Sequence, residues 1–445
     1  MMGEANLLLA ALIERAGLSN AGLAKRVNML GAEHRLRYDH ASVARWIRDG
    51  ATPRDPGPDL ICQVIGEAMR TTVTRADIGM ERRPAISSVP LPQLVERATA
   101  LWRGDQRDKV AGPPAAGAEA VAPVWEWENP PDDIDVAHDG RRQVEPVDVR
   151  RLRQLRDRYQ EMYRRVGGVP VRPRLIAALN EHAAPLLRDT YDNRTGRELL
   201  RAAGGLAALA GVCAYDADQQ GLAQRYLFGA LRMAKASNDK RFGAYVVALL
   251  STHALHGNQP RLVVQYAEAA LRAARGHLGP ALAADLHSLA GKAYARMGES
   301  DGCQRHMRES ELAAARIVLG DEPAEASYVQ PGLVETQVAE ALRRLGDFSA
   351  AQTYADESVR LAGGTHLRGR VHRYAGLALI VAQRGDVDQA VHVGTQMLEY
   401  AEGMESGRIR DRVAQVAGAL RRHARVPAVA EFLERADTDA QLRGF

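Results

Sequence analysis

The stretch from Tyr38 to Gly50 contains side chains whose types and spacing suit hydrogen bonding to DNA bases. Asp39 can cap the N-terminus of a helix, and Gly50 can end it. Val43 and Trp46 fall on one apolar face of that helix. The opposite face carries His40, Ala41, Ser42 and Arg45. An apolar face opposite a short polar face with an arginine is typical of a major-groove reader, although an ordinary amphipathic surface helix has the same pattern.

Other reactive side chains lack the companions that their chemistry requires. His253 and His256 are spaced as in some metal sites, but no acidic third ligand stands at a matching distance, so helical packing explains the pair. Cys62, Cys213 and Cys303 form no Cys-x-x-Cys pair, and no glycine-rich phosphate loop is found. We therefore expect no metal, no cofactor and no enzymatic activity.

Composition narrows the class of protein. The 445 residues suffice for two or three domains, and 59 Lys and Arg nearly balance 55 Asp and Glu. Almost all the basic residues are Arg, which a GC-rich coding bias explains as well as a nucleic-acid surface does. Three widely separated cysteines favour a reducing compartment. No signal peptide or stretch of membrane-spanning length is evident, so we expect a cytoplasmic protein without membrane contact.

Residues 1–80 are predicted to form a small helical domain. Apolar periodicity and turn residues predict four helices in it, over residues 6–16, 20–30, 39–49 and 60–65. Ser19 can cap the second helix, and a Pro-rich turn precedes the fourth. The domain has ten basic and nine acidic residues, so DNA binding would depend on a few well-placed side chains and on dimerisation.

This domain resembles the repressor-like helix-turn-helix family of the phage-repressor and Xre type. Residues 17–20 with 23–27, and 42–46 followed by Asp49-Gly50, carry the resemblance. It implies that Asn20 contacts phosphate and that Arg45 contacts guanine. The sequence departs from the family in an insert over 29–38, whose arginines either contact phosphate or lie in a solvated loop. The candidate DNA-contacting residues are Asn20, Arg35, Arg37, Tyr38, His40, Ala41, Ser42, Arg45 and Arg48.

Residues 81–148 have the composition of a linker. Pro, Gly and Ala dominate its first half, apart from one predicted helix over 91–103. Residues 119–139 then carry seven acidic and no basic residues. This acidic stretch, which includes Trp125 and Trp127, could dock on a basic surface and restrain the first domain. Alternatively, it is a flexible spacer whose tryptophans pack against the next domain.

Residues 149–445 are predicted to form helical repeats. A turn-like sequence recurs at five anchor positions, spaced 39, 41, 48 and 39 residues apart: Asp218, Gly257, Gly298, Gly346 and Gly385. Small residues recur seven positions before and five after most anchors, where two helices can approach closely. The pattern resembles tetratricopeptide repeats with lengthened helices. We expect about five repeats flanked by further helices over 149–189 and 406–436, and hence an all-α chain with an α-solenoid.

A stack of such repeats forms a curved groove that suits a peptide or a partner helix. The repeat alignment places the second, fifth, ninth and twelfth side chains of each first helix on the concave side. The candidate groove residues are Ser251, Asp285, Ser288, Lys292, Thr336, Glu340, Arg343 and His372. A solvated surface is the alternative explanation for these residues.

The whole chain resembles actinobacterial helix-turn-helix/tetratricopeptide regulators of differentiation and secondary metabolism. In architecture alone, it also resembles the peptide-responsive regulators of Gram-positive bacteria. The resemblance implies a homodimeric regulator that binds double-stranded DNA at a palindromic operator, with a peptide or protein effector at the repeats. The alternative is a protein-interaction scaffold whose first domain no longer reads DNA, which the near-neutral charge and the insert favour.

Overall fold

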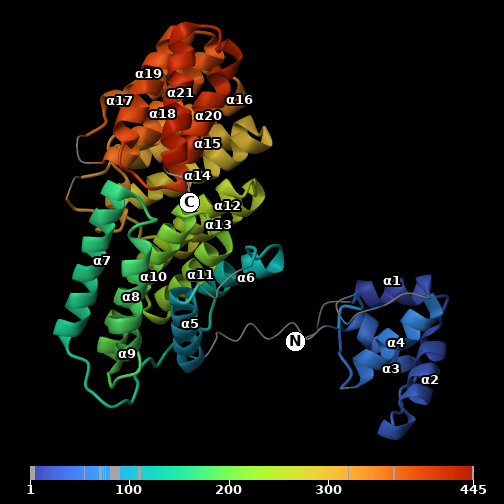
Figure 1. Cartoon of the computed structure of the whole chain (residues 1–445). Coiled ribbons are helices and arrows are strands. Elements are labelled where there is room, and N and C mark those ends of the chain that lie inside the picture. The colour runs from blue at the N-terminus through green and yellow to red at the C-terminus, as the bar shows by residue number, and fades with distance from the viewer. Residues whose placement is uncertain are drawn as a thin grey trace. The chain divides into compact units, whose positions relative to one another are not determined.

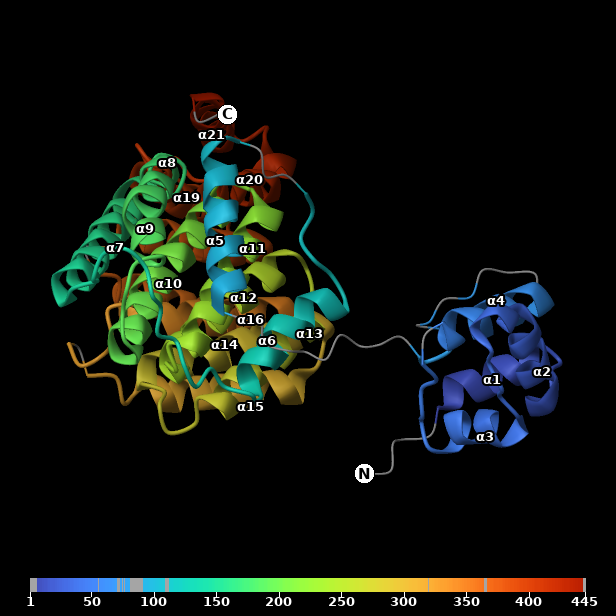
Figure 2. The same ribbon diagram turned by 90° about the horizontal axis from the view of Figure 1, so that it is seen from below.

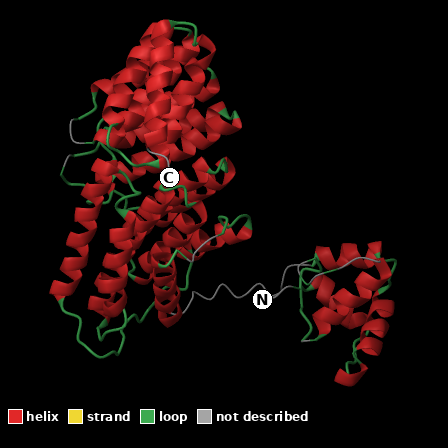
Figure 3. Cartoon of the chain, in the orientation of Figure 1, coloured by secondary structure: helices red, strands yellow, loops and turns green. Residues whose placement is uncertain are grey.

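The computed structural model is helical throughout the part of the chain that it describes, which comprises residues 6–54, 56–69, 73, 75, 77–80, 91–108, 112–318, 320–363 and 366–442 (Figure 3). Two isolated bridges are the only extended pairings within those residues. The chain divides into two compact units, Met1–Ser87 and Ser88–Phe445 (Figure 1). The predicted all-α class with an α-solenoid is confirmed.

The described residues of the first unit, which we call the head, form four α-helices and a short 3-10 turn. They are α1 (Leu7–Arg15), α2 (Asn20–Leu30), η1 (Ala32–His34), α3 (His40–Arg48) and α4 (Gly57–Met69). Side-chain caps explain where three helices begin: Asn6, Ser19 and Asp39 each accept a hydrogen bond from a backbone N–H in the first turn. Val43 and Trp46 of α3 lie in the apolar core that all four α-helices share.

The second unit contains five consecutive helix hairpins, as the repeat spacing predicts. The hairpins are α10 (Asn193–Asp216) with α11 (Gln220–Ala236), α12 (Lys240–His256) with α13 (Pro260–Ala273), α14 (Pro280–Met297) with α15 (Ser300–Ala314), α16 (Leu333–Leu345) with α17 (Phe348–Arg360), and α18 (Leu367–Arg384) with α19 (Val387–Ala401). A short turn, η3 (Ala326–Tyr328), lies between the third and fourth hairpins. The flanking elements are α7 (Pro146–Val166), α8 (Arg172–Ala178), η2 (Leu179–Ala183), α9 (Ala184–Leu186), α20 (Gly407–Leu420), η4 (Arg421–His423) and α21 (Pro427–Leu442).

The anchor glycines have the backbone conformation that ends a helix. Gly298, Gly346 and Gly385 each follow a helix in the left-handed region, where glycine is favoured. Close packing explains the small residues before them: a Cβ added to Gly291 would lie 2.8 Å from the Met307 side chain. At the second anchor, Asn258 rather than Gly257 has the positive φ, so the turn lies one residue later than the alignment predicts.

The expected linker over 81–148 differs most from the structure. Helices α5 (Leu91–Gln106) and α6 (Ala118–Glu128) belong to the second unit and lie against its repeats (Figures 1 and 2). Trp102 and Trp127 are each 1% exposed in the repeat core. We call residues 91–108 and 112–144 the strap. Its Pro- and Gly-rich composition hides this packing because the apolar anchors are few and far apart.

The acidic part of the strap docks on cations of the repeats. The Asp133 carboxylate accepts two hydrogen bonds from the Arg232 guanidinium, at 2.6 and 2.8 Å. Glu128 pairs with Arg272 at 2.9 Å. Trp127 therefore packs against the next domain, as the spacer interpretation expects, whereas Trp125 is 45% exposed.

The beginning and end of the repeat array meet at a buried contact that we call the clasp. Asp216, at the end of α10, is fully buried. Its carboxylate accepts hydrogen bonds from the Gly168 N–H (2.7 Å) and the Ser406 hydroxyl (2.7 Å). It also accepts one from the Arg368 guanidinium (2.6 Å). The clasp therefore joins α10, α18 and the start of α20, segments up to 190 residues apart.

Within the part of the chain that the structure describes, one helix is long and apolar enough to cross a membrane, contrary to the expectation that no stretch would be. It is α10, and 78% of its most apolar window is buried within the repeat unit. Eleven of its residues between Leu199 and Ala214 are in the repeat core. Its apolar character thus has a structural explanation as the central helix of a folded domain.

Candidate functional site

Helix α3 of the head presents the face that the sequence predicts. Val43 is fully buried and Trp46 is 5% exposed, so one side of α3 is fixed to the core. His40, Ala41 and Arg45 are exposed on the other side. Trp46 also meets the Tyr38 ring edge-on, with 4.9 Å between ring centroids. A short helix held on one side and open on the other can enter a major groove.

Ser42 and Tyr38 are placed differently from the expectation. Ser42 is 8% exposed, and its hydroxyl donates to the Asp39 carboxylate at 2.7 Å, while its N–H donates at 2.8 Å. Both bonds lower the pKa of Asp39. The Ser42 N–H bond and a return bond, from the Asp39 N–H to the Ser42 hydroxyl at 3.4 Å, form a capping box. Tyr38 packs against Trp46 in the head core. Both residues therefore help to position α3, and the Ser42 hydroxyl is already engaged in the cap.

The insert between α2 and α3 is folded rather than a loose loop. The Asn28 side chain accepts from the Tyr38 N–H at 2.9 Å and donates to the Tyr38 carbonyl at 2.8 Å. Arg35 and Arg37 are exposed in this segment, and Arg35 has a left-handed backbone. Asn20, in the first turn of α2, is half-buried.

Arg48, the last predicted DNA contact, is engaged with a neighbour. Its guanidinium donates to the Asp49 carboxylate at 2.7 and 3.0 Å. This bond lowers the pKa of Asp49. Arg48 therefore carries an exposed, partly neutralised charge. Arg45 is exposed at the centre of the open face.

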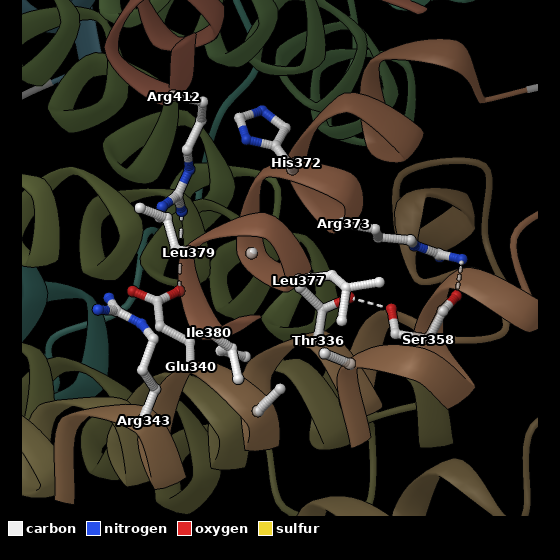
Figure 4. Close-up of a pocket in the computed structure, with 13 residues that line it drawn as sticks. Thr336, Glu340, Arg343, Ser358, His372, Arg373, Leu377, Leu379, Ile380 and Arg412 are labelled. Carbon is white, nitrogen blue, oxygen red and sulfur yellow. Dashed lines mark hydrogen bonds and ion pairs between the residues drawn. The ribbon is translucent and has the colours of Figure 1, made fainter. Parts of the chain in front are cut away.

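In the repeats, four of the eight predicted groove residues line one cavity. Thr336, Glu340 and Arg343 come from α16, and His372 comes from α18 (Figure 4). The space between the lining atoms is 390 Å³ with its open mouth included. About 20 Å³ admits the centres of water molecules, which is enough for one or two waters. A fifth predicted residue, Lys292 of α14, approaches one of these lining residues: its Nζ lies 3.0 Å from the Glu340 carboxylate.

The other three predicted groove residues are buried in helix packing. The Ser251 hydroxyl donates to the Val247 carbonyl of its own helix at 2.8 Å. Ser288 likewise donates to the Asp285 carbonyl at 3.0 Å. The Asp285 carboxylate accepts from the Tyr328 hydroxyl at 2.5 Å, and burial raises the pKa of Asp285. The repeat alignment cannot tell an open position from a covered one.

The cavity is strongly cationic around a single carboxylate. Besides Lys292, the guanidinium groups of Arg412 and Arg296 lie 3.8 and 3.9 Å from the Glu340 carboxylate. Burial opposes ionisation of Glu340, but these cations hold its pKa well below the usual range. Burial and the neighbouring cations Arg368 and Arg412 lower the pKa of His372 and so favour its neutral form.

Sequence reasoning missed several residues of this cavity. Arg412 lies on α20, which follows the last recognised repeat, so its register could not be aligned with the others. Arg373 is 8% exposed and donates to the Ser358 carbonyl at 3.1 Å.

The histidine pair on α12 has packing partners. A ring nitrogen of His253 lies 3.0 Å from the Gln220 carbonyl, and the His256 ring contacts the Arg408 guanidinium. Among the described residues, no group of three or more His, Cys, Asp or Glu side chains could hold a metal ion.

Comparisons with known proteins give limited similarity. A family profile described as the SP15 N-terminal domain matches residues 9–81, within the head. Among solved structures, the chain is similar to the crystal structure of a Rap protein complexed with competence and sporulation factor, with 12% identity and a TM-score of 0.43. That match covers 67% of this chain and 98% of the other. No curated protein sequence matched the chain.

Proposed function

We propose that the chain is a sequence-specific DNA-binding regulator whose repeats bind a peptide or protein effector. One observation carries the proposal: α3 is capped and anchored on one side, and exposes His40, Ala41 and Arg45 on the other. Arg45 can donate two hydrogen bonds to the O6 and N7 of guanine. Arg35 and Arg37 lie in the adjoining segment, where they can contact phosphate.

The head alone offers few such contacts, so we propose that two copies bind a palindromic operator as a homodimer. Two heads repeat the base and phosphate contacts across two half-sites. The resemblance of the whole chain to regulators of differentiation and secondary metabolism supports this role in the cytoplasm. In this proposal the repeats carry no enzymatic activity and transmit the presence of an effector.

The test is a selection from a random double-stranded DNA pool with the full chain. We expect enrichment of one motif with two inverted half-sites. The matched selection with the Arg45→Ala chain should lose the preference at one base position of each half-site. A pool that stays random at every salt concentration would overturn the proposal.

That negative result would favour the second function, a protein-interaction scaffold. Two features of the head favour it: ten basic residues against nine acidic ones over 1–80, and the folded insert between α2 and α3. A scaffold needs only the repeat unit, so its partner should bind a chain with Arg45→Ala as well as the unchanged chain.

A further inference from the structure

We propose that the cavity between α16, α18 and α20 binds one carboxylate group of the effector. This inference rests on the proposed effector function of the repeats and names the chemistry that they recognise. The cavity has a cationic side, an apolar wall and a hydroxyl-bearing end, as Figure 4 shows. The ligand class is therefore a carboxylate attached to a small apolar group, such as the C-terminal residue of a peptide or a short carboxylic acid.

The charges of the site are unbalanced in favour of an anion. Lys292, Arg296 and Arg412 approach Glu340, which is the only carboxylate among the cavity-lining residues. Arg343 adds a fourth positive charge near Glu340, and Arg373 adds a fifth at the hydroxyl-bearing end of the cavity. One internal carboxylate thus faces four cations, and like charges confined in partly buried space favour the uptake of a further anion.

Two side chains that line the cavity, Arg343 and His372, have hydrogen-bonding groups that are not fully used. The Arg343 guanidinium makes a single long hydrogen bond, 3.4 Å, to the Gln383 side chain. The His372 imidazole, which lines the cavity beside Arg412, has no hydrogen-bond partner among the described residues. A guanidinium presents its donors in a planar fork that matches the two oxygens of a carboxylate.

The rest of the cavity suits the apolar group that we propose is attached to the carboxylate. Ala339, Leu377 and Ile380 form an apolar wall, all of them 5% exposed or less. At the far end the hydroxyl groups of Thr336 and Ser358 are 2.5 Å apart and bonded to each other. Because the interior admits only one or two waters, the ligand places its carboxylate inside and leaves any larger body at the open mouth.

The test uses the full chain and measures its thermal midpoint in sodium acetate against sodium chloride at equal ionic strength. We expect acetate to raise the midpoint more than chloride does. Arg343→Gln and Arg412→Gln should each weaken apparent acetate binding about tenfold or more, the effect of losing a charge-assisted hydrogen bond. Arg308→Gln is the matched control, since Arg308 is exposed on α15 and does not line the cavity.

Further binding measurements distinguish a peptide ligand from a small carboxylic acid. A short apolar peptide with a free C-terminus that binds at least tenfold tighter than acetate, and than its own C-terminal amide, indicates a peptide ligand. Acetate that binds as well as the peptide indicates a small carboxylic acid. Equal midpoints in acetate and chloride, or an acetate effect that survives Arg343→Gln, would overturn the inference.

Arg343→Gln keeps the inference testable because Arg343 has no ion pair within 4.0 Å among the described residues, so its loss should not impair folding. The DNA selection is independent of the acetate measurement. A chain that enriches a DNA motif but ignores acetate would refute the carboxylate site alone, whereas the reverse result would refute the DNA-binding function alone.

Discussion

The head and the repeat unit differ in how they hold positive charge. In the head, Arg35, Arg37 and Arg45 are exposed on a small apolar core. In the repeats, the cations of the cavity and of the clasp are largely buried, and each set surrounds a single carboxylate. The Arg368 side chain, for example, is 18% exposed beside Asp216. Exposed cations can be removed at little cost in stability and can meet a polyanion. Buried cations stabilise the fold only while their carboxylate stays in place.

The largest expected effect is the loss of the clasp carboxylate. Asp216→Ala leaves the Arg368 guanidinium buried without its partner, together with the Gly168 N–H and the Ser406 hydroxyl. We expect the free energy of unfolding of the second unit to fall by about 3–5 kcal/mol. Urea denaturation measures it. The control is Asp139→Ala, an exposed carboxylate that should change stability by less than about 0.5 kcal/mol.

A pair of tryptophans tests whether the strap is part of the repeat fold. Trp127 is 1% exposed and packs closely on Gly243, whereas Trp125, on the same helix, is 45% exposed. Trp127→Ala should destabilise the second unit by about 3 kcal/mol or more, and Trp125→Ala by less than about 1 kcal/mol. Equal effects in urea denaturation would mean that the strap is a linker, as its composition alone suggests.

Acidification should weaken the repeat unit. Burial lowers the pKa of six of its histidines: His253, His256, His287, His306, His366 and His372. Unfolding returns each imidazole to its ordinary pKa of about 6.5. Below that pH the unfolded chain binds more protons than the folded chain does. The stability that is present above about pH 6.5 is therefore lost as the pH falls.

We therefore expect the thermal midpoint of the second unit, measured by calorimetry, to decrease between about pH 7 and pH 5. His372→Gln should make this decrease smaller, since one buried imidazole no longer takes up a proton on unfolding. A midpoint that stays constant over this range would show that the buried histidines do not affect stability.

The smallest expected effect concerns Arg37, which we propose contacts a DNA phosphate. Arg37→Ala should weaken binding to all DNA sequences similarly and reduce the slope of log Kd against log salt by about 1. Fluorescence anisotropy at several salt concentrations measures the slope. An unchanged slope would place Arg37 away from the DNA, in the solvated loop that the sequence also allows.

Local patterns predicted the helices of both units well. Asp39 caps α3, and Gly298, Gly346 and Gly385 end the first helices of three repeats, because capping and left-handed turns depend on nearby residues. Neither pattern shows which side chains are covered from a distance. Ser42 was expected on the open face, but it completes the cap of its own helix.

Contacts between distant segments could not be predicted. The clasp joins Asp216 to Ser406, 190 residues away, and no local pattern marks either residue. The packing of the strap was missed for the same reason, since Trp127 contacts Lys240 and Gly243 of α12, more than 100 residues later. In the groove, Glu340 and Arg343 were identified by repeat alignment, whereas Arg412 lies beyond the last aligned repeat.

The most direct test of base reading by α3 compares Arg45→Ala with Arg15→Ala, an exposed arginine on α1, against the selected DNA motif and random DNA. We predict that Arg45→Ala weakens binding to the motif by about 1–3 kcal/mol and changes binding to random DNA much less. Arg15→Ala should leave the ratio of the two affinities unchanged. An equal loss on both DNAs for Arg45→Ala would contradict base reading by α3.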